Sequence, residues 1–141
     1  MQLSLLDMNL PKNIKRKAEK LIGRQKIFEA ILESKKMDLE PKMVASYQGN
    51  ASQRNNQFYS ETEKIALTES EIEEYRRALK KLNLVYNSLK PIQKNIWEQR
   101  YLLGRFDVDV YNDLNVPDRT YYRLKREMIA VVAEAFGLMA E

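Results

Sequence analysis

The segment from Asp113 to Glu127, DLNVPDRTYYRLKRE, constrains the fold of this chain more than any other stretch of its sequence. Asn115 is a residue type that tolerates the left-handed backbone conformation of a tight turn. Proline is suited to the first turn of a helix, and aspartate is favoured there by capping and by the helix dipole, so Pro117 and Asp118 mark a helix start. The pattern predicts a short turn followed by a helix over Pro117–Ala130.

This helix has two chemically different faces. Tyr121 and Leu124 lie three residues apart and are predicted to face the protein core. Arginine can bond guanine through two hydrogen bonds and can also bind phosphate. Two interpretations of the outward residues are open: contact with DNA, or a basic face in solvent. We favour DNA contact, in which Lys125 lies at the flank and, with Arg126, touches only the DNA backbone. The candidate DNA-binding residues are Arg119, Thr120, Tyr122, Arg123, Lys125 and Arg126.

The sequence around this segment is typical of an all-α protein, because it has no strand-like alternation of apolar and polar residues. A helix that opens at Pro91 is expected to end at Gly104, and Asp107–Leu114 is expected to form a second, short helix. These elements predict a helix-turn-helix over 107–130, within a helical domain over 59–141.

The first half of the chain is predicted to contain a basic helical segment over 1–36 and a flexible linker over 37–58. The linker is expected because Pro41, Gly49 and a polar run break the helical pattern. The apolar residues of Ile65–Leu89 recur at heptad-like spacing. That spacing suits either a helix packed on its own domain or the seam of a homodimer.

The basic face of the first segment has three interpretations: a second DNA-binding arm, a helix lying on a membrane surface, or a solvated face. The membrane interpretation is the weakest, because the apolar stripe lacks tryptophan. The candidate secondary DNA contacts are Lys12, Lys15, Arg16, Lys20 and Arg24.

Composition argues against an enzyme. The net charge is +4, and the chain has neither histidine nor cysteine, so the commonest general base and the commonest zinc ligands are missing. We expect no cofactor and no metal; Asp107, Asp109 and Asp113 offer magnesium ligands in principle, but helix capping accounts for Asp107 equally well. With no long apolar run and no signal peptide pattern, we expect a cytoplasmic protein without a membrane partner.

Two segments of the sequence resemble known protein families. LKPIQKNIWEQRYL, residues 89–102, resembles the helix before the helix-turn-helix in the promoter-reading domain of bacterial sigma factors. RTYYRLKRE, followed by AEAFG, is similar to the ArpU (autolysin regulatory protein) family of phage and prophage transcription regulators, over about 61–137. The resemblance implies a sigma-like fold and the activation of late genes for packaging and lysis. It implies double-stranded DNA and RNA polymerase as partners, in the cytoplasm of a bacterial host. A small terminase-like DNA-packaging protein is the alternative.

Two residues depart from the usual motif. Tyr111 stands where a small residue usually lets the two helices approach, so we expect a wider crossing or a tyrosine ring turned over the turn. Pro117 stands where serine usually caps the second helix. Asp118 is expected to take over the cap, so that this helix starts one residue later.

Overall fold

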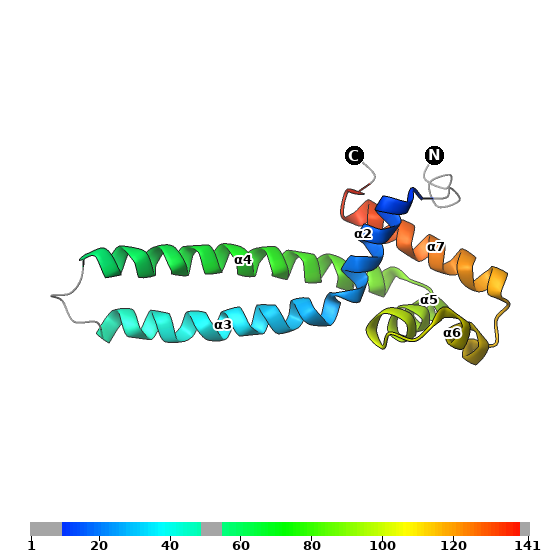
Figure 1. Ribbon diagram of the computed structural model, residues 1–141, viewed down its shortest axis with the longest axis horizontal. Helices are drawn as coiled ribbons and strands as arrows, with labels where there is room; N and C mark the ends of the chain where they lie inside the picture. Colours follow the sequence, from blue (N-terminus) through cyan, green and yellow to red (C-terminus); the bar gives the residue numbers. More distant parts are fainter. Residues whose placement is uncertain (1–9, 49–54, 139–141) are drawn as a thin grey trace. The chain divides into compact units, whose positions relative to one another are not determined.

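The computed structural model describes residues 10–48 and 55–138, and these residues contain helices and no strand, which confirms the all-α prediction. Figure 1 shows the order of the elements along the chain. They are α2 (Lys12–Gly23), α3 (Gln25–Gln48), α4 (Asn55–Ser88), α5 (Pro91–Ile96), the π-helix η2 (Trp97–Leu102), α6 (Asp107–Leu114) and α7 (Asp118–Ala135).

The chain divides into two compact units. We call the first the core unit; it combines the described residues of Met1–Lys26 with those of Lys80–Glu141. The second is the hairpin unit, Ile27–Leu79. The basic amino-terminal helix α2 therefore belongs to the same unit as α6 and α7. The sequence had suggested a separate segment over 1–36, of which residues 1–9 lie outside the described residues.

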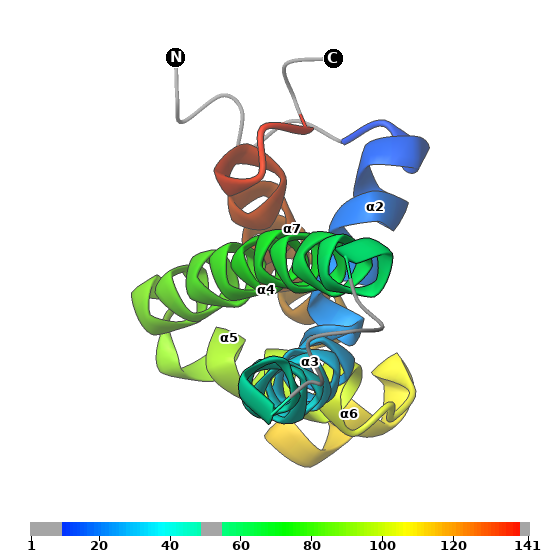
Figure 2. The same cartoon turned by 90° about the vertical axis from the view of Figure 1, so that its left-hand side faces the viewer.

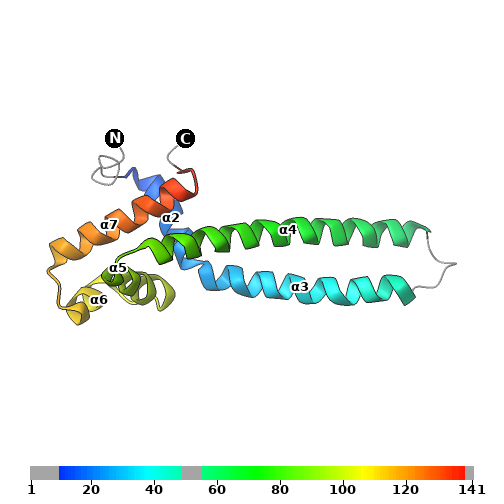
Figure 3. The ribbon, with the colours of Figure 1, turned by 180° about the vertical axis from the view of Figure 1, so that it is seen from behind.

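In the hairpin unit, α3 from Ile27 onward and α4 up to Leu79 run side by side in opposite directions (Figures 1 and 3). The rings of Phe28 and Tyr75 lie 5.7 Å apart, and Lys35 Nζ lies 2.6 Å from a carboxylate oxygen of Glu71. Their apolar seam is narrow, as expected of two helices that each present one apolar stripe. Its described buried members are Phe28, Leu32, Ile72 and Leu79.

The core unit is built around large, completely buried side chains. In α2, Ala18 and Ile22 lie one helical turn apart and have no exposed surface, so this face packs inward. Helix α2 contacts both α7 and η2 (Figures 1 and 2). The Trp97 indole Nε1 donates a hydrogen bond of 2.9 Å to Gln25 Oε1, which ties η2 to the residue that follows the break after α2.

The predicted linker over 37–58 is helical at both described ends, since α3 continues to Gln48 and α4 begins at Asn55. Proline usually ends or kinks a helix because it lacks a hydrogen-bond donor. Helix α3 nevertheless continues through Pro41. The amino-terminal helical segment has its break elsewhere, at Arg24, whose amide donates to the carbonyls of Lys20 and Leu21.

The turn between α6 and α7 agrees with the prediction. Asn115 has φ 57° and ψ 42°, and is the one non-glycine residue in the described part of the chain with positive φ. The Val116 amide then donates to the Tyr111 carbonyl at 3.2 Å, closing the end of α6. Helix α7 begins at Asp118 with Pro117 before it, and Asp118 Oδ1 accepts the Arg119 amide at 2.7 Å. The helix thus starts one residue after proline, but Pro117 is its N-cap and no side chain caps it, so the predicted cap by Asp118 does not form.

Candidate nucleic-acid interface

The outward face of α7 carries most of the predicted DNA-binding residues. Arg119, Tyr122, Arg123 and Arg126 are exposed, and Thr120 is half-buried. On the opposite side, Tyr121 and Met128 have no exposed surface and Leu124 is also buried, as predicted for Tyr121 and Leu124. Burial of one stripe fixes which way the arginines point, because residues three, four and seven apart share a helix face.

Little negative charge accompanies this face. Among the described residues, Arg119 and Arg126 make no ion pair, and Arg123 Nη1 lies 3.7 Å from a carboxylate oxygen of Glu127. An ion pair of that length at an exposed site is weak. The arginine side chains therefore remain able to bind an anion from solution.

Tyr111 is accommodated by stacking of its ring against α7. Its ring centroid lies 5.5 Å from that of Tyr121 and 6.2 Å from that of Tyr122, and the rings of Tyr121 and Tyr122 are 5.2 Å apart. Tilted and edge-to-face pairs at these separations are favourable. The ring thus lies against the first turns of α7, and neither a wider crossing nor a ring turned over the turn is needed to describe its contacts.

Lys125 does not lie at the flank of the interface, and the prediction for it was wrong. Its side chain is buried, and its Nζ donates to both carboxylate oxygens of Asp107 at 3.0 and 3.1 Å. A carboxylate oxygen of Glu19 lies 3.7 Å from the same Nζ. A buried lysine needs such partners because its charge is costly to remove from water. Lys125 therefore serves the packing of α7.

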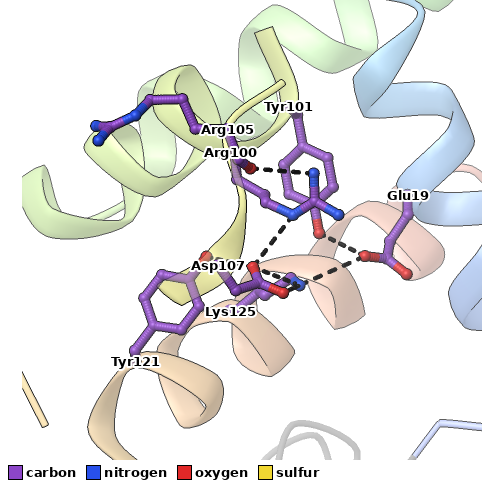
Figure 4. Close-up of polar contacts among 7 residues, drawn as sticks. All are labelled: Glu19, Arg100, Tyr101, Arg105, Asp107, Tyr121 and Lys125. Carbon is purple, nitrogen blue, oxygen red and sulfur yellow. Dashed lines mark hydrogen bonds and ion pairs between the residues drawn. The ribbon is translucent and has the colours of Figure 1, made fainter. Parts of the chain in front are cut away.

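Asp107 is the centre of this partly buried cluster (Figure 4). Its Oδ1 accepts a 2.5 Å hydrogen bond from the Tyr121 hydroxyl and lies 3.1 Å from Arg100 Nε. Burial alone would raise the pKa of Asp107, but the hydrogen bonds from Tyr121 and Lys125, with the charges of Lys125 and Arg100, outweigh burial and lower that pKa. An ionised Asp107 thus joins the start of α6 to η2 and α7.

Glu19 extends the cluster to α2. The Tyr101 hydroxyl donates a 2.7 Å hydrogen bond to a Glu19 carboxylate oxygen, and burial followed by this hydrogen bond strongly raises the pKa of Tyr101. Glu19 is the one acidic residue between Lys12 and Lys26. That isolation within a basic helix was the one sign in the sequence that Glu19 faces a partner.

The candidate secondary contacts on α2 are exposed, namely Lys12, Lys15, Arg16, Lys20 and Arg24. They do not behave as one group. Lys12 and Lys15 line a groove together with Arg126 of α7, whereas Arg16 and Lys20 are not among the residues that line it. The structure therefore brings part of the second predicted basic site to the first.

Several acidic residues that could be considered as metal ligands or as an acidic site are paired with cationic side chains. Arg105 Nη2 donates to Asp113 at 2.5 Å, Asp107 is held by Lys125, and the described residues contain no cluster of three potential metal ligands. In the acidic run before Arg76, Glu73 pairs with Arg76 at 2.9 Å. These contacts account structurally for Asp107, Asp113 and Glu73.

The heptad-like stripe of α4 is used within the chain. Ile72, Leu79, Leu82 and Leu89 are buried, while the side chain of Ile65 lies outside the described residues. This agrees with the interpretation of a helix packed on its own chain. A homodimer through Ile65–Leu89 stays a prediction.

No helix in the described part of the chain is long and apolar enough to cross a membrane. Comparison of the chain with protein-family models, curated proteins and solved structures finds no match. The resemblance to the ArpU family therefore stays a prediction, and a function has to be argued from the geometry of α6, the turn and α7.

Proposed function

We propose that this chain binds double-stranded DNA with α7 in the major groove and regulates transcription. The observation that carries the proposal is a helix held by α6 and a left-handed turn at Asn115, with arginines on its outward face. A helix presented in this way is the element that reads base edges in helix-turn-helix proteins.

The spacing of the arginines suits a major groove. Arg119 and Arg126 are seven residues apart, which is about 10 Å along a helix axis. The major groove is about 12 Å wide. Arg119, Thr120 and Arg123 in the first two turns can therefore face base edges while Arg126 lies at the level of the backbone.

The chemistry of each side chain suggests its role. Arg119 and Arg123 can bond guanine through two hydrogen bonds each. Tyr122, with 42% of its surface exposed, offers a hydroxyl for phosphate, and Thr120 offers a methyl group for thymine. Phosphate contacts alone carry no sequence information. Because Arg119, Arg123 and Thr120 can contact base edges, their arrangement supports sequence-dependent binding.

The biological role rests on the resemblance stated for residues 61–137. It supports a phage or prophage regulator of late genes acting in the cytoplasm of a bacterial host. Activation would require contact with RNA polymerase or with a second copy of the chain, and the exposed acidic residues before Arg76 are the candidate surface for it. They are Glu69, Glu71, Glu73 and Glu74.

Selection of bound sequences from random duplexes, at a fixed and stated salt concentration, tests the proposal. An Arg119→Ala/Arg123→Ala variant is then compared with an Arg76→Ala/Arg77→Ala control, which removes the same charge from exposed positions of the hairpin unit. Each bidentate contact is worth about 1–3 kcal/mol. Since 1.4 kcal/mol is tenfold, the α7 variant should bind on the order of 10- to 1000-fold more weakly.

The control should bind the selected duplex nearly as the wild type does. Equal binding by the α7 variant and the wild type, with native circular dichroism, would overturn the proposal. The mass of the free protein is the accompanying measurement. A monomer or dimer agrees with a regulator, whereas a ring of many copies contradicts it and agrees with a DNA-packaging component.

A further inference from the structure

A groove lies between α2 and α7 within the core unit. One part, of about 210 Å³, is lined by Leu10, Lys12, Lys15, Arg126 and Ile129. An adjoining part, of about 200 Å³, shares Lys15, Arg126 and Ile129 and adds Tyr122 and Lys125. Cationic groups from two different helices therefore converge on one hollow with an apolar floor.

The charge in this groove is unbalanced. Lys125 is neutralised from the inner side by Asp107 and Glu19. Lys12, Lys15 and Arg126 make no ion pair among the described residues, and the described lining residues include no carboxylate. A concave surface lined by one sign of charge concentrates the oppositely charged ion.

Helix α2 is fixed against the rest of the core unit. Glu19 accepts the Tyr101 hydroxyl, Gln25 accepts the Trp97 indole, and Ile22 is completely buried. Lys12 and Lys15 are therefore carried on a rigid element and are not part of a free arm. Positioning them in advance reduces the ordering entropy that binding would otherwise cost.

The size of the groove limits what it can hold. Pockets for drug-sized ligands usually measure about 300–1,000 Å³, whereas each part here is near 200 Å³. A single phosphate group with some of its water fits that space. Two of its lining residues, Arg126 and Tyr122, are on the face of α7 that the proposed function places against DNA.

We propose that the groove between α2 and α7 binds one phosphate of the DNA backbone, next to the bases read by α7. Lys12 and Lys15 approach this phosphate from α2, and Arg126 approaches it from α7. The proposal rests on the proposed function, and it makes α2 part of the same DNA-binding surface. It also separates the α2 cations into Lys12 and Lys15, which bind this phosphate, and Arg16 and Lys20, which do not.

The test compares two variants of the full chain that lose the same charge from α2, Lys12→Ala/Lys15→Ala and the matched control Arg16→Ala/Lys20→Ala. Binding to the selected duplex is measured over a series of salt concentrations. Each neutralised phosphate contributes about 0.9 to the slope of log affinity against log salt. The Lys12/Lys15 variant, which keeps Arg126, should lose up to about 0.9 from this slope. The control should keep the wild-type slope.

Replacing single phosphates of the duplex by neutral methylphosphonate locates the contact. At one backbone position the replacement should weaken binding by the wild type and the control more than binding by the Lys12/Lys15 variant, which keeps only Arg126 at this phosphate. Equal slopes for the two variants, or no such position, would overturn the proposal.

Inorganic phosphate distinguishes the source of the ligand. If millimolar phosphate raises the melting temperature of the wild type but not of the Lys12/Lys15 variant, while both have the same DNA salt slope, the groove binds a free anion and the DNA-backbone proposal is wrong. Failure of the proposed function looks different, because wild-type chain would then bind no duplex, or the Arg119/Arg123 variant would bind normally. If the Arg119/Arg123 variant loses affinity for the duplex as expected, but the two α2 variants have equal salt slopes, only the groove proposal is overturned.

Discussion

In the core unit, side chains as large as Trp97 and Tyr121 have no exposed surface, whereas the described seam residues of the hairpin unit keep 5–8% of theirs. The polar contacts of the two units also differ in how deeply they are buried. The ion pair of Lys125 with Asp107 is largely buried, and that of Lys35 with Glu71 is exposed on the Glu71 side. Buried polar groups require defined partners, so the core unit has one well-determined arrangement. The hairpin depends on a generic apolar stripe, which tolerates change.

The largest expected effect is that of Trp97→Ala. The indole is completely buried, lies edge-on to Tyr86 at 5.7 Å and donates to Gln25, so its loss leaves a cavity and an unsatisfied acceptor. Truncation of a buried aromatic residue costs about 3–5 kcal/mol. Urea unfolding followed by circular dichroism should show this loss.

Phe28→Ala provides the comparison in the hairpin unit, because Phe28 contacts Tyr75 but keeps 8% of its surface exposed. It should destabilise the protein less than Trp97→Ala. A Phe28 variant that loses as much free energy of unfolding as the Trp97 variant would contradict the contrast between the units.

Lys125→Met should have the next largest effect. Methionine keeps the length and apolar stem of lysine but leaves Asp107 without its lysine partner, while Tyr121 and Arg100 remain. Loss of a hydrogen bond to a charged group costs about 1.5–3 kcal/mol, and the partial exposure of Asp107 favours the lower end of that range. The free energy of unfolding is measured beside Lys20→Met, an exposed control on α2 that should change little.

The loss of stability at low pH tests the same contact from the side of Asp107. The pKa of Asp107 is lowered in the folded protein, so its ionised carboxylate stabilises the fold above the unfolded-state pKa of about 4. That stabilisation is lost as the pH falls through the lower folded-state pKa. Asp107→Asn should therefore flatten the decline in urea midpoint below pH 4, and an unchanged decline would show that other carboxylates carry it.

Asn115→Ala should have a smaller effect, because it changes a backbone preference and removes no buried contact. The left-handed conformation costs a residue with a Cβ about 1–2 kcal/mol, a penalty that asparagine partly avoids. Asn115→Gly is the matched variant and should equal or exceed the wild type in stability. Thermal unfolding of the three proteins tests this order, and an alanine variant as stable as the glycine variant would show that the turn is not under this constraint.

The sequence predicted the parts of the fold that depend on neighbouring residues. Pro117, Asp118 and Asn115 determine the turn and the start of α7 by their own backbone chemistry, and Asp107–Leu114 forms α6 as expected. The burial of Lys125 follows from the helical period of α7, because it lies four residues after Tyr121 and three before Met128. Its partners Asp107 and Glu19 were not predictable in this way, because they come from other helices.

The packing of α2 in the core unit was not predictable either, because it depends on contacts between distant parts of the sequence. The bond from Trp97 to Gln25 spans 72 residues, and a basic stripe gives no indication of such a contact. Of the candidate interface, the exposed residues Arg119, Tyr122, Arg123 and Arg126 followed from the helical period. The convergence of Lys12 and Lys15 on Arg126 did not, because it arises from packing between helices at opposite ends of the chain.

The smallest effect is expected from the exposed ion pair of the hairpin. The hydrogen bond from Lys35 to Glu71 raises the pKa of Lys35, which means that the contact stabilises the fold below the usual lysine pKa and is lost as the pH rises through the higher value. Exposed pairs contribute little because water and salt screen them. A double-mutant cycle with Lys35→Ala and Glu71→Ala should therefore give a coupling near the detection limit at physiological salt, and smaller still at high salt. A coupling as large as that between Lys125 and Asp107 would show that the hairpin, like the core unit, relies on specific polar contacts.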